Sequence, residues 1–111
     1  MEKGTIVLVR FPFSDLEGEK LRPAVVLAPE NEYGDVCLAF VTSRLVPDAS
    51  DAVVLQSEDT GFGKTGLKVG STIRVGKIVT VEKHLIAGKL GALSRLHLAE
   101  LDAKLRHIFK L

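Results

Sequence analysis

Residues 21–29 read LRPAVVLAP, and they place an arginine and a proline at the head of an apolar run. The branched and apolar residues after Pro23 predict a buried strand. Arginine is costly to bury, and proline cannot donate a hydrogen bond to a sheet ladder. Proline is nevertheless tolerated at the first position of a strand, and it biases the residue before it, Arg22, toward extended geometry. The stretch therefore predicts a strand over residues 22–28 whose entrance holds a rigidly presented cation.

Further short strands are predicted on both sides of this one. Their ranges are residues 5–11 before it, and residues 35–43, 52–56 and 71–82 after it. The last strand is expected to carry a break or bulge at Gly76. Two segments rich in glycine and polar residues read as loops, residues 11–20 and residues 57–70, the second with one helical turn near residues 57–60. Residues 83–93 continue as either extended chain or turns.

The final segment follows a helical period. Apolar residues recur there with helical spacing, at Leu98, Leu101, Leu105 and Ile108. Ser94 is a good N-cap, and Leu93 before it can pack on Leu98 as a hydrophobic staple. His97 occupies the position at which a capping box has a glutamate. His97 lies off the apolar stripe, and it is expected, like His107, to lie in solvent.

Strands first and a helix last predict an α+β fold that is mostly β. We expect a small, strongly curved antiparallel sheet or barrel, with the C-terminal α-helix packed on it. The chain has 111 residues, which suits one compact domain.

Composition and charge exclude several classes of function. Hydrophobic residues make up 46% and charged residues 26%, as in an average soluble globular protein, and no apolar run approaches the length of a membrane span. The net charge of +1 argues against coating nucleic acid by bulk electrostatics, although a local phosphate site is compatible with it. The single cysteine, Cys37, allows no internal disulfide, and the three histidines lack the spacing of metal ligands. We expect a cytoplasmic protein with no metal, no cofactor and no membrane partner.

Polar residues at strand ends are the remaining candidates for chemistry. If the strands at 22–28 and 35–43 are antiparallel neighbours, Arg22 and the pair Thr42 and Ser43 share one edge of the sheet. A guanidinium and two hydroxyls there would form a compact phosphate site. From spacing alone, a surface ion pair at Arg22 and a strand-terminating Thr42 explain the pattern at least as well.

Taken in order, these features resemble the MazF/PemK family of type II toxins, which are small endoribonucleases paired with an antitoxin. The matching pieces are KGTIV at residues 3–7, RPAVV at 22–26, the pair TS at 42–43, STIRVGKIVTVEK at 71–83 and the terminal helix. The resemblance spans residues 3–111 and implies one toxin domain over residues 1–111. It also implies a small SH3-like antiparallel β-barrel with a C-terminal helix, and a homodimer.

The resemblance implies a specific reaction on single-stranded RNA. The 2′-hydroxyl attacks the adjacent phosphate without a metal, and the products are a 2′,3′-cyclic phosphate and a 5′-hydroxyl end. Arg22 and Thr42 match the catalytic pair of one branch of the family. Because a guanidinium stays protonated, charge stabilisation is the firmer role for Arg22. Thr42 would donate a hydrogen bond to a phosphate oxygen, with Ser43 beside it.

The late strand and the first loop supply further RNA-binding candidates by the same resemblance. Arg74, and Ser71 three residues before it, match the family's late strand. Another branch has an aspartate two residues after this arginine, but Gly76 stands there, so the general base stays open. Lys20 would attract phosphate, and Phe13 would stack on a base, although a core phenylalanine is an equal reading.

Loop residues also enter the open question of the base. Glu17 or Glu19 could take the 2′-hydroxyl proton, and Phe11 shares the stacking role expected of Phe13. The implied antitoxin is an acidic or amphipathic, partly disordered segment that occupies the RNA groove. Two alternatives remain: a CcdB-like toxin that binds gyrase through its C-terminal helix, and an inactive dimeric binding module of the same fold.

Overall fold

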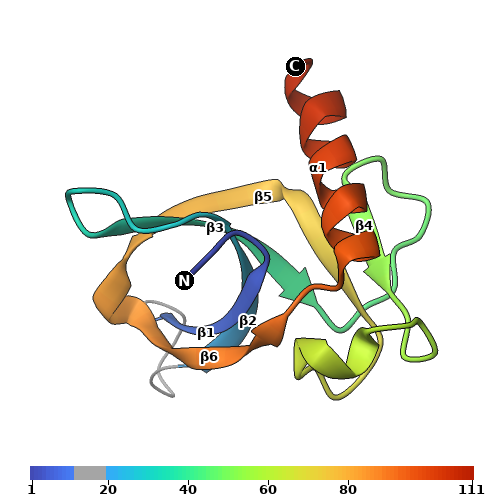
Figure 1. Ribbon diagram of the computed structural model, residues 1–111, viewed down its shortest axis with the longest axis horizontal. Helices are drawn as coiled ribbons and strands as arrows, with labels where there is room; N and C mark the ends of the chain where they lie inside the picture. Colours follow the sequence, from blue (N-terminus) through green and yellow to red (C-terminus); the bar gives the residue numbers. More distant parts are fainter. Residues whose placement is uncertain (12–19) are drawn as a thin grey trace.

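The structure is a computed structural model, and it describes residues 1–11 and 20–111 (Figure 1). Within these residues the strands are β1 (Thr5–Phe11), β2 (Lys20–Ala28), β3 (Asp35–Thr42), β4 (Ala52–Leu55), β5 (Ser71–Glu82) and β6 (Ile86–Ala92). The helices are the 3₁₀ turns η1 (Phe62–Thr65) and η2 (Lys83–Leu85) and the α-helix α1 (Arg95–Phe109). The predicted class, mostly β with a C-terminal helix, is confirmed. The turn expected near residues 57–60 was misplaced, because the 3₁₀ turn η1 begins after Gly61.

All the described strands belong to one antiparallel sheet in the order β4-β5-β3-β2-β1-β6. The sheet is open, because β4 and β6 are its two edges. It nevertheless curls so strongly that most of its strands together form a ring (Figure 1). The bulge expected at Gly76 is confirmed. On β3, Ala39 pairs with Ile78 while the next residue, Phe40, pairs with Arg74, so three residues of β5 bulge out between them.

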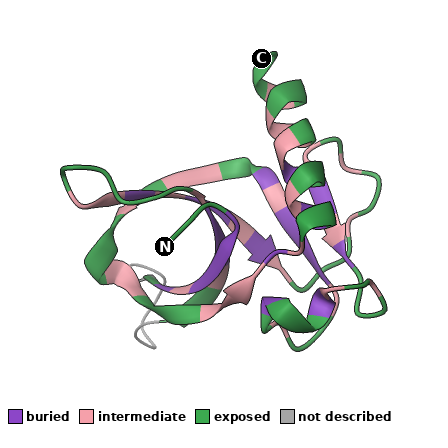
Figure 2. Ribbon diagram, in the orientation of Figure 1, coloured by how far each residue is buried: buried purple, intermediate pink, exposed green. Residues whose placement is uncertain are grey.

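The sheet packs a separate apolar core on each face. The inner core, inside the curl, contains Val7, Val9, Ala24, Val26, Val36 and Leu38. The helix-side core contains Ile6, Val25, Ala39, Val41, Val53, Leu55, Phe62, Ile73, Val75, Leu93 and Leu101. Val25 and Val26 belong to different cores because successive side chains of a strand point to opposite faces. Buried residues accordingly lie mainly on the strands, whereas α1 is largely exposed or half-buried (Figure 2).

Helix α1 begins as its sequence predicts. The Ser94 side chain accepts a hydrogen bond from the His97 amide at 3.2 Å, which is the N-cap contact. Leu101 is fully buried in the helix-side core, and Leu98 and Leu105 pack at its margin. In the described part of the chain, no helix is long and apolar enough to cross a membrane.

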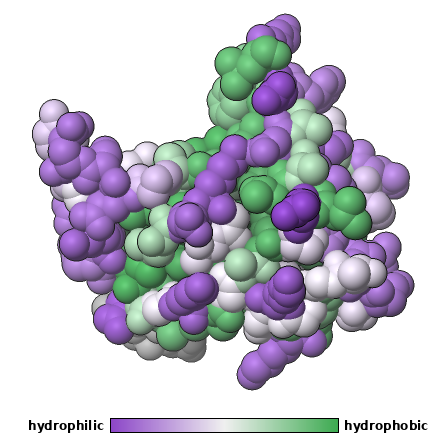
Figure 3. All heavy atoms as spheres, viewed as in Figure 1, coloured by the Kyte–Doolittle hydropathy of each residue, from purple (hydrophilic) through white to green (hydrophobic). Residues whose placement is uncertain are grey.

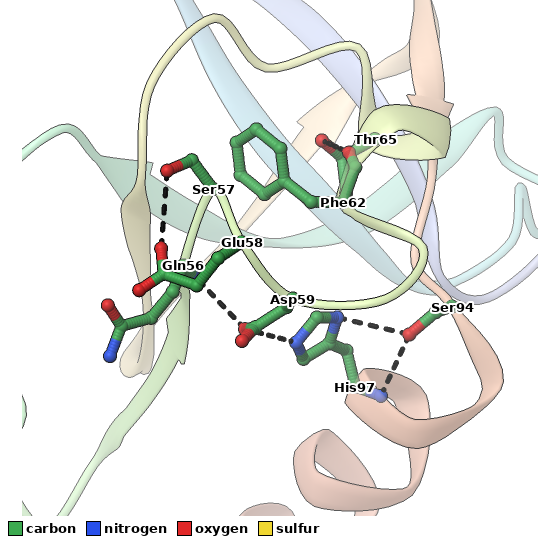
Figure 4. A network of polar contacts seen from close by, with 8 residues as sticks. All are labelled: Gln56, Ser57, Glu58, Asp59, Phe62, Thr65, Ser94 and His97. Atoms are coloured by element: carbon green, nitrogen blue, oxygen red, sulfur yellow. Dashed lines mark hydrogen bonds and ion pairs between the residues drawn. The ribbon is translucent and has the colours of Figure 1, made fainter.

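The expectation of a solvent-exposed His97 is wrong, because the loop between β4 and η1 covers it. His97 is only 4% exposed, and its ring bridges Asp59 and Ser94 at 3.0 Å on each side (Figure 4). Because the Asp59 carboxylate can only accept, Nε2 carries a proton, and in the neutral ring Nδ1 accepts from the Ser94 hydroxyl. The Gln56 amide also donates to Asp59, and these hydrogen bonds, that of Gln56 first and that of His97 second, lower the pKa of the Asp59 carboxyl.

These three side chains have the chemical order of a Ser-His-Asp triad, yet their packing assigns them a structural role. The Ser94 hydroxyl already accepts from the helix amide, and Gly61 lies so close that a Cβ there would be 2.6 Å from the Ser94 Cβ. Neither Asp59 nor His97 lines the two cavities described below. The arrangement ties the loop after β4 to the first turn of α1.

Candidate functional site

The register of β2 and β3 brings their polar ends together. Ala24 pairs with Phe40 in an antiparallel ladder, which confirms that these strands are neighbours. Carried two residues further, the same register sets Arg22 opposite Thr42. Both residues lie on the face of the inner core, because Ala24 belongs to that core and Phe40 packs against it. The arginine therefore stands at the mouth of the curl, just beyond its last buried residues.

A cavity of about 450 Å³ opens at this mouth. Its lining is formed by Arg22, Phe40, Val41, Thr42, Arg44, Val46, Arg74 and Lys77. Among the described residues, this lining includes four cationic side chains and no carboxylate. Like charges so close together repel one another, so the cavity is suited to a phosphate-bearing ligand. Arg74 also pairs with Asp51, whose carboxylate is not part of the lining.

A second cavity of about 300 Å³ adjoins the first. It is lined by Leu21, Arg22, Pro23, Val41, Thr42, Ser43, Leu67, Lys68, Val69 and Ser71. Arg22 and Thr42 line both cavities, so they stand where the two meet. The lining of the second cavity includes five apolar residues, among them Leu21 at 52% and Val69 at 55% exposure, and one cation of its own, Lys68. Together the cavities can hold a chain that presents phosphates on one side and flat apolar groups on the other.

The hydroxyl groups of the site differ in what they can still donate. The Thr42 oxygen accepts from the Arg44 amide at 3.2 Å, so its own proton stays available to a ligand. The Ser71 hydroxyl donates to the Val69 carbonyl at 2.9 Å and is only 3% exposed. Ser43 is exposed at the rim of the second cavity. Thr42 is therefore the best-placed hydroxyl donor, while Ser71 holds the wall formed by the loop before β5.

Arg74 enters the site from β5. Its neighbours Ile73 and Val75 belong to the helix-side core, so its own side chain lies on the face of the inner core, opposite Phe40. Asp51 contacts the guanidinium at 3.3 Å from Oδ2 to Nη2, with the arginine side chain 30% exposed. Two other residues of the link between β3 and β4, Arg44 and Val46, line the larger cavity directly.

The remaining predicted residues are placed less directly. Lys20 is exposed at the start of β2, two residues before Arg22 and so on the same face, but it lines neither cavity. Phe13, Glu17 and Glu19 lie outside the described residues. Across residues 1–11 and 20–111, no group of three or more His, Cys, Asp or Glu side chains gathers to hold a metal ion.

Sequence reasoning missed three cations that line the cavities, Arg44, Lys77 and Lys68. Arg44 had a usable signal, because it follows Thr42 and Ser43 directly. Lys77 had a weaker one, because it sits in the predicted bulge, whose geometry decides where a side chain points. Lys68 lies in a long loop, where sequence carries little information about direction.

The geometry agrees with the comparisons to known proteins. Residues 2–109 match the family described as PemK-like, MazF-like toxin of type II toxin-antitoxin system. Because the match covers nearly the whole chain, the protein belongs to this family. No curated protein matched the sequence of this chain.

Solved structures share the fold at low sequence identity. The MazE-MazF crystal structure (form II) from Deinococcus radiodurans is 22% identical with a TM-score of 0.77, over 100% of this chain and 96% of that chain. The Mycobacterium tuberculosis toxin MazF-mt6 is 18% identical with a TM-score of 0.74, over 96% and 97%. An endoribonuclease from a mycobacterial species is 15% identical with a TM-score of 0.72, over 100% and 92%. The curled sheet with its terminal helix is therefore the fold of MazF.

Proposed function

We propose that this toxin is a metal-independent, sequence-selective endoribonuclease that cleaves single-stranded RNA. The observation that carries the proposal is the placement of Arg22 and Thr42 at the junction of two cavities with a strongly cationic lining. Membership of the MazF-like toxins supports it, as does the mycobacterial endoribonuclease that shares the fold. The scissile phosphate binds at the junction, and the chain on either side of it runs into the two cavities.

The proposed reaction is a transesterification within the RNA. The 2′-oxygen forms a bond to the adjacent phosphorus, the bond from phosphorus to the 5′-oxygen breaks, and the products are a 2′,3′-cyclic phosphate and a 5′-hydroxyl. The 2′-hydroxyl loses one proton, and the leaving 5′-oxygen gains one. Arg22 stabilises the extra negative charge on the phosphate oxygens, and the Thr42 hydroxyl donates a hydrogen bond to one of them.

The neighbouring side chains are assigned to RNA binding. Arg74 contributes a second guanidinium in the larger cavity, and Ser43 lies at the rim of the smaller one. Lys20 adds phosphate attraction at the start of β2, and Phe13 stacks on a base in the proposal. Ser71 acts indirectly, because its hydroxyl holds the Val69 carbonyl.

The proposed partners follow from the same charges. A cognate antitoxin with an acidic or amphipathic segment would fill the cationic cavities and block RNA. One solved structure of the same fold is a mycobacterial endoribonuclease in complex with its cognate antitoxin, which supports this assignment. The protein is proposed to act as a homodimer in the cytoplasm.

The direct test is cleavage of single-stranded RNA by purified protein in EDTA. We expect cleavage of RNA, no cleavage of an oligonucleotide with a 2′-deoxy residue at the scissile position, and a cyclic phosphate product. Arg22→Ala should lower kcat about 10²–10³-fold, as removal of one transition-state donor does elsewhere. Thr42→Val should do the same while keeping the shape of the side chain. Arg95→Ala, an exposed position at the start of α1, is the matched control.

Failure to cleave any RNA, or cleavage insensitive to Arg22→Ala, would contradict the proposal. A second candidate function would then gain weight. Apolar side chains gather at the C-terminal end of α1 and just beyond it (Figure 3), where Phe109 is 54% and Leu111 is 88% exposed. A CcdB-like toxin would bind gyrase with such a surface. Growth arrest that survives Arg22→Ala but is lost with Phe109→Ser would favour that function.

A further inference from the structure

Asp51 contacts the Arg74 segment of β5 through both its side chain and its backbone, and Arg74 lines the larger cavity. Its carboxylate oxygen Oδ2 lies 3.3 Å from Arg74 Nη2, with the two side chains 23% and 30% exposed. Its backbone carbonyl accepts from the Val75 amide at 2.7 Å, directly next to Arg74. The partly buried pair is shielded from solvent more than a surface ion pair, and the backbone contact removes the freedom that weakens most such pairs. Asp51 therefore constrains both the strand and the guanidinium.

Gly76 makes room for this carboxylate. A Cβ built on Gly76 would stand 2.7 Å from Asp51 Oδ2 and 3.3 Å from the Asp51 Cβ, which is inside contact distance for the oxygen. The backbone of Gly76 is not in the left-handed region, so its φ angle does not require a glycine. The absent side chain is what matters, because the space above Gly76 is occupied by the carboxylate from the β3–β4 link.

Arg74 still has donors to offer. Its Nε is buried and has no hydrogen-bond partner among the described residues. A buried donor without a partner is costly, so the position of the Arg74 side chain is not explained by its own hydrogen bonds. The same side chain lines the cationic cavity, and a guanidinium with one nitrogen held by a carboxylate can present its remaining N–H groups in a fixed direction.

We propose that Asp51 is a positioning residue that aims the Arg74 guanidinium at the scissile phosphate, and that Gly76 exists to admit it. The inference rests on the proposed endoribonuclease function. Another branch of the family has an aspartate two residues after this arginine, where this chain has Gly76. Asp51 supplies a carboxylate in the same space from another segment of the chain. Asp51 acts through Arg74 and does not itself touch the reacting atoms.

Electrostatics alone makes the opposite prediction for Asp51→Asn, which allows a sharp test. Removing the carboxylate that pairs with Arg74, one of the four cations of the larger cavity, should strengthen phosphate binding. A role through charge alone would therefore leave kcat unchanged and lower KM. A positioning role predicts a kcat lower by about 10²-fold, because small misplacements of a transition-state contact have effects of that size, with KM unchanged or higher. Gly76→Ala should lower kcat in the same way, because the new methyl displaces the carboxylate without removing it. Asp48→Asn, an exposed aspartate of the same link, is the matched control.

A relocated carboxylate provides the rescue. The double variant that combines Asp51→Ala with Gly76→Asp removes the carboxylate from position 51 and places one on β5, in the vacated space. A Cβ on residue 76 stands 3.3 Å from the Cβ of residue 51, so the new carboxylate starts close to the place of the old one. We expect the double variant to recover at least about tenfold in kcat over Asp51→Ala. Thermal unfolding of each variant shows that the compared proteins are folded.

A second measurement separates this inference from the endoribonuclease proposal. In protein with ¹⁵N-labelled arginine, the Nε–H resonance of Arg74, identified by its loss in Arg74→Lys, is followed during titration with inorganic phosphate. We expect a saturable shift in the wild type that needs at least about tenfold more phosphate in Asp51→Asn. If the wild type cleaves no RNA, the function fails while this titration still tests the pair.

Three results would overturn the inference. One is a kcat within about threefold of wild type for both Asp51→Asn and Gly76→Ala, far below the effect of a misplaced contact. Another is an Arg74 titration that Asp51→Asn leaves unchanged. The third is loss of the acidic limb of the pH profile of kcat in Asp51→Asn, which would make Asp51 a general base in place of a positioning residue.

Discussion

Truncating Arg44 should weaken the response of RNA binding to salt in a calculable way. Arg44 is exposed and lines the larger cavity, but it supports Thr42 only through its backbone amide. Arg44→Ala therefore removes one cation and leaves the Thr42 hydrogen bond in place. Few positions in the site allow charge to be removed with so little structural disturbance.

The magnitude follows from the four cations of the larger cavity. For single strands, each neutralised phosphate contributes about 0.7 to the slope of log affinity against log salt, so four contacts predict a slope of about −2.8 and three contacts about −2.1. Between about 50 and 200 mM salt, the wild type should then lose about 50-fold in affinity and Arg44→Ala only about 20-fold.

The assay is fluorescence anisotropy with a short labelled RNA made uncleavable by 2′-deoxy substitution at the scissile position. Affinity is measured at several salt concentrations for the wild type, Arg44→Ala and Arg95→Ala. Equal slopes for the wild type and Arg44→Ala would refute the assignment of the larger cavity to phosphate. An equal drop for Arg95→Ala would show that only overall charge matters.

Further predictions concern the scaffold. Leu101→Ala should lower the free energy of unfolding by about 2–5 kcal/mol, because the side chain is fully buried in the helix-side core; urea denaturation measures this, and a loss below about 1 kcal/mol would contradict the packing. The pKa of Asp59 is lowered from its ordinary value of 3.8, so its ionised form stabilises the fold above that value, and this contribution is lost as pH falls through the lowered pKa. Asp59→Asn should therefore flatten the acid side of the stability profile measured by denaturation between about pH 2 and 5, and an unchanged profile would count against the network. Gly66→Ala should lower the free energy of unfolding by more than about 1 kcal/mol, because Gly66 has φ +74° and a Cβ there would collide with the Leu90 carbonyl. Gly63→Ala, with open space around the position, should be tolerated. Equal melting temperatures of the two variants would refute this contrast.

Local sequence signals predicted the elements of the fold well. Branched and apolar runs marked the strands, and the pattern of leucines with Ser94 at its head marked α1. These signals are short-range, because side-chain alternation and capping depend on residues a few positions apart. The expected neighbourhood of β2 and β3 followed from their order in the chain, and the register confirms it.

Errors and omissions arose where distant segments meet. His97 was expected in solvent because its own helix gives no sign of the loop that covers it. Arg44 and Lys77 were missed because a strand end and a bulge decide where their side chains point. Asp51 could not be predicted as a partner of Arg74 from the sequence, because 23 residues separate them along the chain.

The sequence by itself determined the strands β1 to β5, the bulge, the terminal helix and the chemical identity of the strand-end residues, because each depends on local backbone preference and on which face a side chain takes. It left β6 open between extended chain and turns. Tertiary structure alone decided how those residues act together. The antiparallel register and the strong curl carry Arg22, Thr42 and Arg74 from three strands to one mouth, and the space left by Gly76 admits Asp51 beside them. A phosphate site needs several donors within a few ångströms, and only the packed sheet sets those distances.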